Sequence, residues 1–332
     1  MATGCAKINP QEIDKPLALS LITVIIPNFN HAQFLQRRID SILQQSFQDF
    51  ELIMLDDAST DNSRDIMESY RSHLKVKAIH YNSHNCGSPF KQWEKGIGLA
   101  NGEWIWIAEG DDYCDPHFIQ ALLPALTEPG CVLAYNEVRW VNEHDELLKA
   151  SQPQPAQWYS GPEFLARHMM LQDHLVNSGM VMFRQSALQG LPNRWTEMKQ
   201  AGDYLLWVQI AAKGKVYASG TEQAAFVRHS QSLSLQQLGT PQHLQESLEV
   251  QDWMVQHAGV SKRLQQYYFQ QQLVQLRTSA RHWQQAAFEA VYQFWKTEAV
   301  SRGIQLPDWR IRQQAFAAKL RHYLQQHKQK WR

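Results

Sequence analysis

Short runs of apolar, β-branched and aromatic residues alternate with longer amphipathic segments between about residue 21 and residue 133. One apolar run followed by one amphipathic segment is typical of a βα unit, and a series of such units predicts a parallel sheet covered by helices. The predicted strands are residues 21–27, 50–55, 76–81, 103–108 and 131–135. The predicted helices are residues 32–45, 62–72, 87–100 and 116–126.

The pattern is less regular beyond Asn142. Residues 151–157 are rich in proline and glutamine, which indicates a surface loop. A strand near residues 179–183 and a helix near residues 203–212 are predicted after this loop.

The composition changes again at Thr240, a suitable helix N-cap, which is followed by Pro241, a residue favoured in the first helical turn. The chain beyond them is rich in glutamine and aromatic residues and has few turn signals, which predicts three or four helices. We therefore predict three parts: an N-terminal leader at residues 1–19, a main α/β domain at residues 20–239 and a helical C-terminal region at residues 240–332.

Composition narrows the possible partners and compartments. The 32 lysines and arginines balance the 32 aspartates and glutamates, so the net charge favours no nucleic-acid partner. The 4 cysteines are dispersed without a C-x-x-C pair, which argues against a disulfide framework or a zinc knuckle and favours reduced thiols in the cytoplasm. The apolar residues 17–26 run into Pro27 and are too few to span a bilayer, so we interpret them as leader plus buried strand.

Polar residues follow each of the first four predicted strands. We call these polar segments the strand exits. Because ligands of parallel α/β sheets bind at the carboxyl ends of the strands, the exits are the candidate site. The exits are Pro27-Asn28-Phe29-Asn30, Asp56-Asp57-Ala58-Ser59, Asn82-Ser83-His84-Asn85 and Glu109-Gly110-Asp111-Asp112. Neither G-x-G-x-x-G nor G-x-x-x-x-G-K-[ST] occurs, so no glycine loop is available to hold nucleotide phosphates.

The fourth exit carries three carboxylates, those of Glu109, Asp111 and Asp112. Three negative charges after a buried strand repel one another unless a divalent cation lies among them, so the cluster favours a hard metal bridging carboxylate and diphosphate. The alternative is a loop whose aspartates merely precede and cap the next helix.

These motifs, in this order, resemble those of the family 2 glycosyltransferases. The motifs are Pro27-Asn28-Phe29-Asn30, residues 56–61, Ala100-Asn101-Gly102-Glu103 leading a strand into Asp111-Asp112, and Gly202-Asp203-Tyr204. The resemblance extends over roughly residues 20–235. It implies a GT-A, Rossmann-like α/β fold with a mostly parallel central sheet flanked by helices, followed here by a C-terminal α-helical appendage. Two positions depart from the family pattern: Gly202 stands where a glutamate usually precedes the base, and Glu109 stands in place of an aspartate.

The resemblance implies an inverting, metal-dependent enzyme. It would move a sugar from a nucleoside diphosphate donor, most simply a UDP-sugar, to a hydroxyl of a glycan or lipid-linked acceptor in bacterial surface polysaccharide or glycan synthesis. The implied donor-binding residues are Pro27, Asn28, Phe29, Asn30, Asp57, Lys91, Asp111 and Arg228, with Asp57 on the nucleobase. The implied ligands of Mn or Mg are Asp112, Asp111 and His229, and the implied catalytic base is Asp203.

The chemistry of the residues agrees with these roles. Sugar transfer needs charge stabilisation on the leaving diphosphate and a base for the acceptor hydroxyl, and direct displacement needs no protein nucleophile. On the residues alone, Asp203 could equally be a carboxylate favoured by the helix dipole, and His229 a packed or solvated histidine.

Two other functions remain as alternatives. A nucleotidyltransferase would use a glycine-rich N-terminal loop with a basic residue, which residues 27–30 do not provide. A catalytically weak glycan-binding or scaffolding protein on a GT-A fold would be expected to lose Asp203 or Asp112, and both are present.

The C-terminal tail is strongly basic, with no acidic residue after Asp308. Its cations are Arg310, Arg312, Lys319, Arg321, Lys328, Lys330 and Arg332. If it is helical, an apolar stripe beginning at Ile311 either lies on anionic lipid or packs on the preceding helices. We therefore expect a cytoplasmic protein, with peripheral contact at the inner face of the cell membrane or self-association through residues 240–332 as the alternatives for this region.

Overall fold

The computed structural model describes residues 22–171, 174–229, 240–278, 285–306, 311, 313–315 and 318. The predicted leader at residues 1–19 lies outside the described residues, as do all seven cations of the basic tail. Ile311 is described and is buried in an apolar cluster with the other C-terminal helices. At this position the stripe therefore packs against protein.

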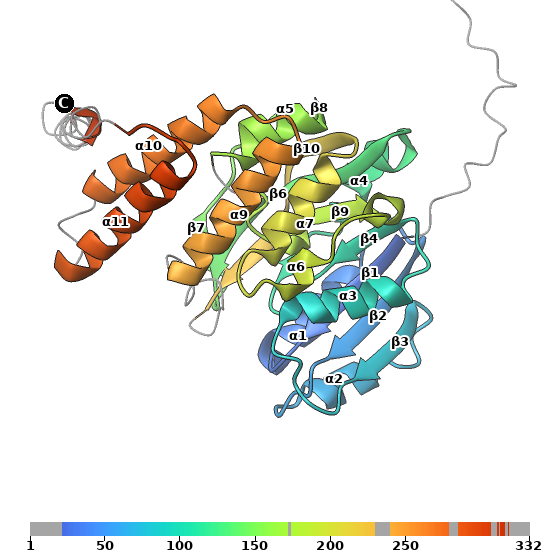
Figure 1. The fold of residues 1–332 in the computed structure, drawn as a ribbon. Helices are drawn as coiled ribbons and strands as arrows, with labels where there is room; N and C mark the ends of the chain where they lie inside the picture. Colours follow the sequence, from blue (N-terminus) through green and yellow to red (C-terminus); the bar gives the residue numbers. More distant parts are fainter. Residues whose placement is uncertain are drawn as a thin grey trace, which may run out of the picture.

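A ten-stranded sheet in the described chain has the main strand order β3-β2-β1-β4-β9-β6-β10-β5, with β7 paired to β6 and β8 to β10 (Figure 1). Its strands are β1 (Ile22–Asn28), β2 (Phe50–Asp56), β3 (Val76–Tyr81), β4 (Trp104–Ile107), β5 (Tyr113–Cys114), β6 (Cys131–Asn142), β7 (Leu147–Lys149), β8 (Gln157–Ser160), β9 (Val181–Arg184) and β10 (Lys215–Arg228).

The sheet is mixed, and its longest strand pairings are parallel, as predicted. Strands β3, β2, β1 and β4 are parallel neighbours, and β6 pairs in parallel with β10. The antiparallel strand β9 lies between these two groups, so both groups run in the same direction. Every residue of β1 and β4 is buried, which explains their nearly continuous apolar sequences.

Helices cover the sheet and continue beyond it. They are α1 (Ala32–Leu43), α2 (Ser63–Ser69), α3 (Pro89–Leu99), α4 (Phe118–Thr127), α5 (Gly161–Phe164), α6 (Arg194–Glu197), α7 (Gly202–Ala211), α9 (Pro241–His257), α10 (Lys262–Thr278) and α11 (Gln285–Ser301). Short π or 3-10 turns are η2 (Leu165–Met169), η3 (Ser178–Met180) and η4 (Gln185–Leu188). Helix α3 packs on β1 and β2, whereas α4 packs on β6 and β10.

The second half of the sheet differs most from the sequence-based prediction. Strand β6 continues to Asn142, and the 14-residue strand β10 was not predicted. The periodicity of β10 is interrupted at Gly220, whose φ is +70°, and its register with β6 shifts near Glu222. Strands β5, β7 and β8 have 2 to 4 residues, too few to give a periodic signal.

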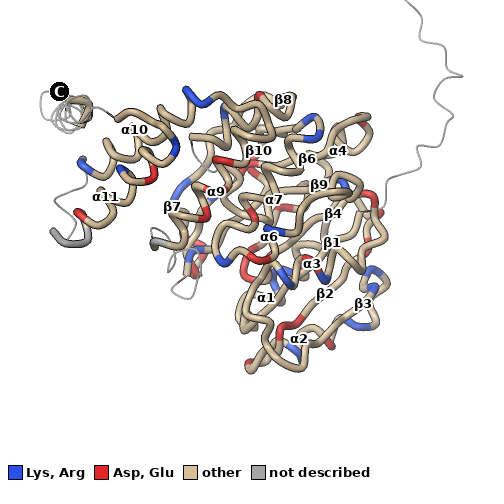
Figure 2. The backbone as a smooth tube through the Cα atoms, viewed as in Figure 1, with Lys and Arg blue, Asp and Glu red and all other residues tan. Residues whose placement is uncertain are grey.

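The predicted C-terminal helical region is present as α9, α10 and α11. Helix α9 belongs to two apolar clusters: Val250 and Met254 join the main core, whereas Leu248 packs with Phe269 of α10 and Trp295 of α11. Helices α10 and α11 form a pair that projects from the sheet (Figure 1). In the described part of the chain, no helix is long and apolar enough to cross a membrane. Positively and negatively charged residues are interspersed along the backbone (Figure 2).

Candidate active site

The exits of β1, β2 and β4 come together at one edge of the sheet, as the pattern predicted. Asn28 Nδ2 donates to Asp56 Oδ1 at 3.2 Å and to Ser59 Oγ at 3.1 Å. The backbone of Gly110 lies so close that a Cβ there would be 3.1 Å from Asn28 Oδ1 and 3.2 Å from the carbonyl oxygen of Pro27. A glycine at position 110 therefore lets the acidic loop pack on β1.

Asp57, in the polar segment after β2, is buried and accepts hydrogen bonds from the segment that follows β3. Its Oδ1 accepts hydrogen bonds from Asn82 Nδ2 at 2.7 Å and from the backbone N–H of Cys86 at 3.0 Å. The Cys86 thiol donates to Asp57 Oδ2 at 3.1 Å. Asn82 and Cys86 were not among the predicted site residues, although the polar stretch after the third strand was the signal that could have found Asn82.

The loop after β1 presents an aromatic ring to solvent. Phe29 is 42% exposed, unlike the buried Pro27 and Asn28 before it. Asn30 adopts a left-handed conformation with φ of 58°, and its Oδ1 accepts the backbone N–H of Thr60 at 2.8 Å. The first two exits are thus joined by a hydrogen bond next to an accessible aromatic residue in the chain.

The two lysines of α3 differ in their surroundings. Lys91, the predicted donor-binding cation, is exposed near the start of the helix. Lys95 Nζ instead donates to Asn82 Oδ1 at 2.6 Å, and Asn82 in turn binds Asp57. Lys95 is therefore the α3 cation connected to the predicted nucleobase contact.

All three carboxylates of the acidic loop make hydrogen bonds within the protein. Glu109 Oε1 accepts the Trp93 indole N–H at 3.0 Å and the Ser178 hydroxyl at 3.1 Å. Burial, together with the charges of Asp111 and Asp112, raises the pKa of Glu109 to about 8.

Asp112 is 2% exposed and both of its oxygens are occupied. Oδ1 accepts the backbone N–H of Val227 in β10 at 2.9 Å, and Oδ2 accepts Asn177 Nδ2 at 2.7 Å. Burial and the charge of Asp111 raise the pKa of Asp112 to about 7. The carboxylate thus connects the acidic loop to two later segments of the chain.

Asp111 is the more accessible of the two aspartates, with 17% of its side chain exposed. Its Oδ2 lies 3.0 Å from His229 Nε2 and 4.0 Å from His31 Nε2. Burial opposes ionisation of Asp111, but the hydrogen bond to His229 and the nearby charge of His31 keep its pKa below the ordinary value. The predicted pair of Asp111 and His229 is therefore brought together, and His31 is an additional neighbour that follows the first exit in sequence.

A buried arginine lies behind this loop. Arg38, on α1, is fully buried, and its guanidinium stacks over the Trp106 ring at 5.2 Å. Its three nitrogens have no hydrogen-bond partner among the described residues. A Cβ on Gly179 would lie 3.2 Å from Arg38 Nη2 and 3.7 Å from Asp112 Oδ2, so the arginine is a nearby opposite charge for Asp112. Sequence analysis did not identify Arg38, because a charged residue in an amphipathic helix is expected to face solvent.

The predicted base, Asp203, lies in the first turn of α7. Its Oδ1 accepts the backbone N–H of Tyr204 at 2.8 Å, and burial raises its pKa to about 6. The preceding Gly202 touches the Phe90 ring, which packs edge-on against Trp93 at 5.3 Å, and Trp93 binds Glu109. The residue before Asp203 is therefore connected to the acidic loop through the contacts of Phe90 and Trp93.

Arg228 is the last residue of β10, and His229 follows it. The Arg228 guanidinium lies 4.7 Å from the centre of the Phe226 ring, and burial lowers its pKa while the charge of Asp112 opposes that effect. Because Val227 binds Asp112 and His229 binds Asp111, the end of β10 lies directly against the acidic loop.

The side chains near the acidic loop can be compared with the ligands that a divalent cation requires. No group of three or more His, Cys, Asp or Glu side chains within the described residues could hold a metal ion by itself. Asp111 and His229 are two adjacent candidate ligands, and each oxygen of Asp112, the third predicted ligand, accepts one protein hydrogen bond. One or two protein ligands completed by substrate phosphates is the usual arrangement for Mg, so the residues fit a cation that binds together with a diphosphate.

Comparisons with known proteins agree with this geometry. The model of the family described as "Glycosyl transferase family 2" matches residues 23–191. A glycosyltransferase of Nostoc sp., alr2836, is 30% identical over 135 residues, covering 40% of this chain and 41% of that protein. The hyaluronan synthase of Pasteurella multocida is 25% identical over 235 residues, covering 70% of this chain and 23% of that protein. The chain spans less than half the length of these curated relatives.

A solved structure has the same fold. The crystal structure of S. aureus TarS residues 1–349 in complex with UDP-GlcNAc superposes with a TM-score of 0.59 at 18% sequence identity, covering 75% of this chain and 69% of that chain. The family match and the GT-A fold together establish that the chain belongs to glycosyl transferase family 2.

Proposed function

We propose that the protein is an inverting glycosyltransferase that moves a sugar from a nucleoside diphosphate donor, most simply a UDP-sugar, to a hydroxyl of a glycan or lipid-linked acceptor. The observation that carries the proposal is the presence of two distinct carboxylate centres: Asp111 lies beside His229, and the half-buried Asp203 follows Gly202, which contacts of Phe90 and Trp93 connect to the acidic loop. One centre suits the leaving diphosphate and the other suits the acceptor hydroxyl.

The donor side has a place for each part of a nucleotide. Phe29 offers an exposed ring for stacking on the base, and the buried Asp57 has Asn82 and Cys86 as neighbours. Aromatic stacking on a base contributes about 1–3 kcal/mol. Two cations belong to this region: Lys95 binds Asn82, and the charge of Asp112 acts on Arg228.

Asp111 and His229 would hold a divalent cation, Mn or Mg, and Asp112 would fix the loop that presents them. When bound, the cation would neutralise charge on the diphosphate as the bond to the sugar breaks. Arg228 then lies where its charge can assist the same leaving group.

Asp203 would act as the base. The acceptor oxygen attacks the anomeric carbon from the face opposite the diphosphate, its proton passes to an Asp203 carboxylate oxygen, and the bond to the nucleoside diphosphate breaks. One displacement inverts the anomeric configuration and needs no covalent enzyme intermediate. Because its pKa is raised only to about 6, Asp203 is deprotonated at neutral pH and is a stronger base than an ordinary aspartate.

The names of relatives suggest the biological setting. They include a hyaluronan synthase and a chondroitin synthase of Pasteurella multocida and a poly(ribitol-phosphate) beta-N-acetylglucosaminyltransferase of Staphylococcus aureus. A role in bacterial surface polysaccharide or glycan synthesis is therefore part of the proposal.

The test is nucleoside diphosphate release from a panel of nucleotide-sugar donors, with Mn, with Mg and with a chelator. We expect release from at least one donor, lost on chelation and restored by the metal. No release from any donor with any glycan acceptor, together with glycan binding by the protein, would favour the non-enzymatic alternative.

A further inference from the structure

The segment leading into the proposed base is held by a residue of the C-terminal helical region. Glu246, in α9, is 6% exposed and faces residues 199–201. Its Oε2 accepts the backbone N–H groups of Gln200 at 2.8 Å and Ala201 at 2.9 Å, and its Oε1 accepts that of Lys199 at 3.0 Å. Three consecutive backbone donors thus converge on one carboxylate.

Further contacts stabilise this arrangement. Gln242, one turn earlier in α9, donates its Nε2 to Glu246 Oε1 at 3.0 Å. Thr240, which caps α9, donates its hydroxyl to Gln200 Oε1 at 2.9 Å. Although burial opposes ionisation of Glu246, the backbone hydrogen bonds keep its pKa below the ordinary value, so its carboxylate is charged.

Residues 199–201 have little freedom to move without moving Asp203. Ala201 is the N-cap of α7, and its carbonyl oxygen accepts the backbone N–H of Leu205 at 3.0 Å. A Cβ on Gly202 would lie 2.4 Å from the carbonyl oxygen of Trp195 and 2.6 Å from Phe90 Cδ2. Because Gly202 is enclosed on these sides, the backbone at residues 199–201 determines where the first turn of α7 begins.

We propose that Glu246 is a positioning residue for the base: by binding the backbone of residues 199–201 it fixes the position of Asp203. This inference rests on the proposed function of Asp203. It means that the catalytic centre is completed by a helix that lies beyond residues 23–191, the segment matched by the family model.

The charged groups around α7 allow the role of Glu246 to be isolated. Glu246 is the charged side chain on α9 that acts on Asp203. On α6, Arg194 pairs with Glu197 at 3.1 Å and with Glu249 of α9 at 2.8 Å, at the surface. On α3, Glu94 accepts Asn193 Nδ2 at 3.1 Å.

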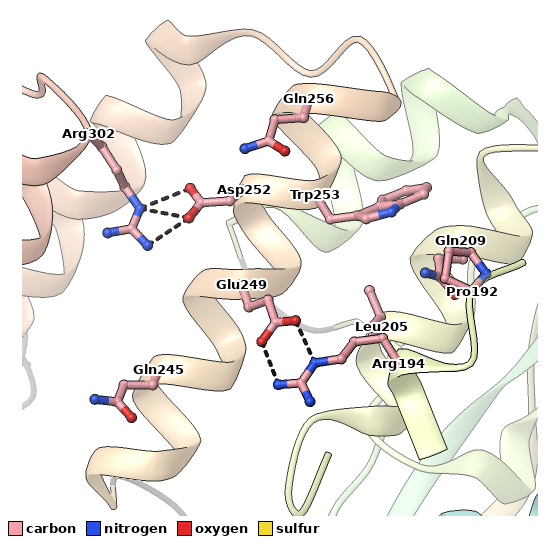
Figure 3. A pocket seen from close by; sticks show the side chains of 10 residues that line it. All are labelled: Pro192, Arg194, Leu205, Gln209, Gln245, Glu249, Asp252, Trp253, Gln256 and Arg302. Atoms are coloured by element: carbon pink, nitrogen blue, oxygen red, sulfur yellow. Dashed lines mark hydrogen bonds and ion pairs between the residues drawn. The ribbon is translucent and has the colours of Figure 1, made fainter. Parts of the chain in front are cut away.

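A matched control is available on the same helix. Glu249 lies one turn after Glu246, lines a cavity of about 410 Å³ between α7 and α9, and points to Arg194 (Figure 3). Its side chain is 43% exposed, and it does not contact residues 199–201 in the described structure. Glu249→Gln therefore removes the same charge from the same helix without releasing the segment before Asp203.

The experiment compares Glu246→Gln with Glu249→Gln and the wild type. For Glu246→Gln we expect turnover to fall by about 10- to 100-fold, because a small misplacement of a catalytic group has effects of this size. The affinity for UDP should stay within about twofold of the wild type, since the donor side is not in contact with α9. The acid limb of the pH profile should move to lower pH, because a negative neighbour that raises the pKa of Asp203 has been removed.

Amide hydrogen exchange provides a readout that does not depend on activity. The N–H groups of residues 199–201 should exchange faster in Glu246→Gln and at the wild-type rate in Glu249→Gln. If the amide variant does not fold, Glu246→Asp keeps the charge and shortens the reach, and we expect reduced turnover and faster exchange at an unchanged pH midpoint.

The inference is overturned if Glu246→Gln has wild-type turnover and pH profile, or if both glutamine variants lose activity equally. If the wild-type protein transfers no sugar, the proposed function fails, but the exchange rates still decide whether Glu246 holds residues 199–201.

Discussion

The donor side and the base side of the site are built in different ways. On the donor side, hydrogen bonds from Asn28 to Asp56 and Ser59 join the loops after β1 and β2, and the loop after β4 packs against β1 through Gly110. On the base side, Asp203 lies in a segment whose backbone is bound by Glu246, a residue of α9. The comparison shows that the loops after the first parallel strands form much of the donor side, which the end of β10 completes through Val227 and His229, whereas the base side depends on α9.

The largest expected effect is on the base side. Replacing Asp203 with asparagine preserves its shape but removes its ability to accept a proton, so turnover should fall by about 10²- to 10⁴-fold. Single-turnover rates with saturating donor and acceptor measure the loss. Turnover near the wild-type rate would mean that another group is the base.

The next largest effect is expected on stability, and it distinguishes Asp112 from Asp111 in the acidic loop. Asp112→Ala leaves the Val227 N–H and Asn177 Nδ2 without their acceptor, so the free energy of unfolding should fall by about 2–5 kcal/mol. Urea unfolding should show a smaller loss for Asp111→Ala, and equal losses would contradict the distinction between the two aspartates.

A smaller effect is expected at the exposed ring of the donor side. Phe29→Ala should weaken UDP binding by about 5- to 100-fold, the range given by the loss of base stacking. The free energy of unfolding should change little in this variant, because the ring is 42% exposed. Trp158→Ala on β8 is the control, since this ring is 43% exposed and lies outside the site. Calorimetric titration with UDP is the measurement, and unchanged affinity in Phe29→Ala would remove Phe29 from the base pocket.

The smallest effect is a change with pH. Asp203 acts in its deprotonated form, and burial raises its pKa to about 6, so turnover should decline as the pH falls through about 6 and level off above it. UDP affinity measured over the same pH range separates this limb from changes in donor binding. An acid limb with its midpoint near the ordinary pKa of an aspartate would contradict the raised pKa of Asp203.

The sequence predicts more of the donor side than of the base side. The first four parallel strands and their polar exits were predictable because buried parallel strands have continuous apolar runs and their loops are local. Strand β10 was missed because polar residues and the left-handed Gly220 interrupt its pattern.

The roles of Arg38 and Glu246 could not be predicted for a related reason. Each is a charged residue in an amphipathic helix, where the expected position is the solvent-facing side. Their burial results from contacts with residues far away in sequence, Trp106 for Arg38 and residues 199–201 for Glu246. Periodicity carries no information about such contacts.

The most direct test of the account is UDP binding, with and without Mn, to Asp111→Asn and Asp203→Asn. The account predicts that Asp203→Asn binds UDP as the wild type does and keeps the gain in affinity that Mn provides, whereas Asp111→Asn loses that gain. Loss of Mn-dependent binding in Asp203→Asn, or its retention in Asp111→Asn, would contradict the separation of a donor side from a base side.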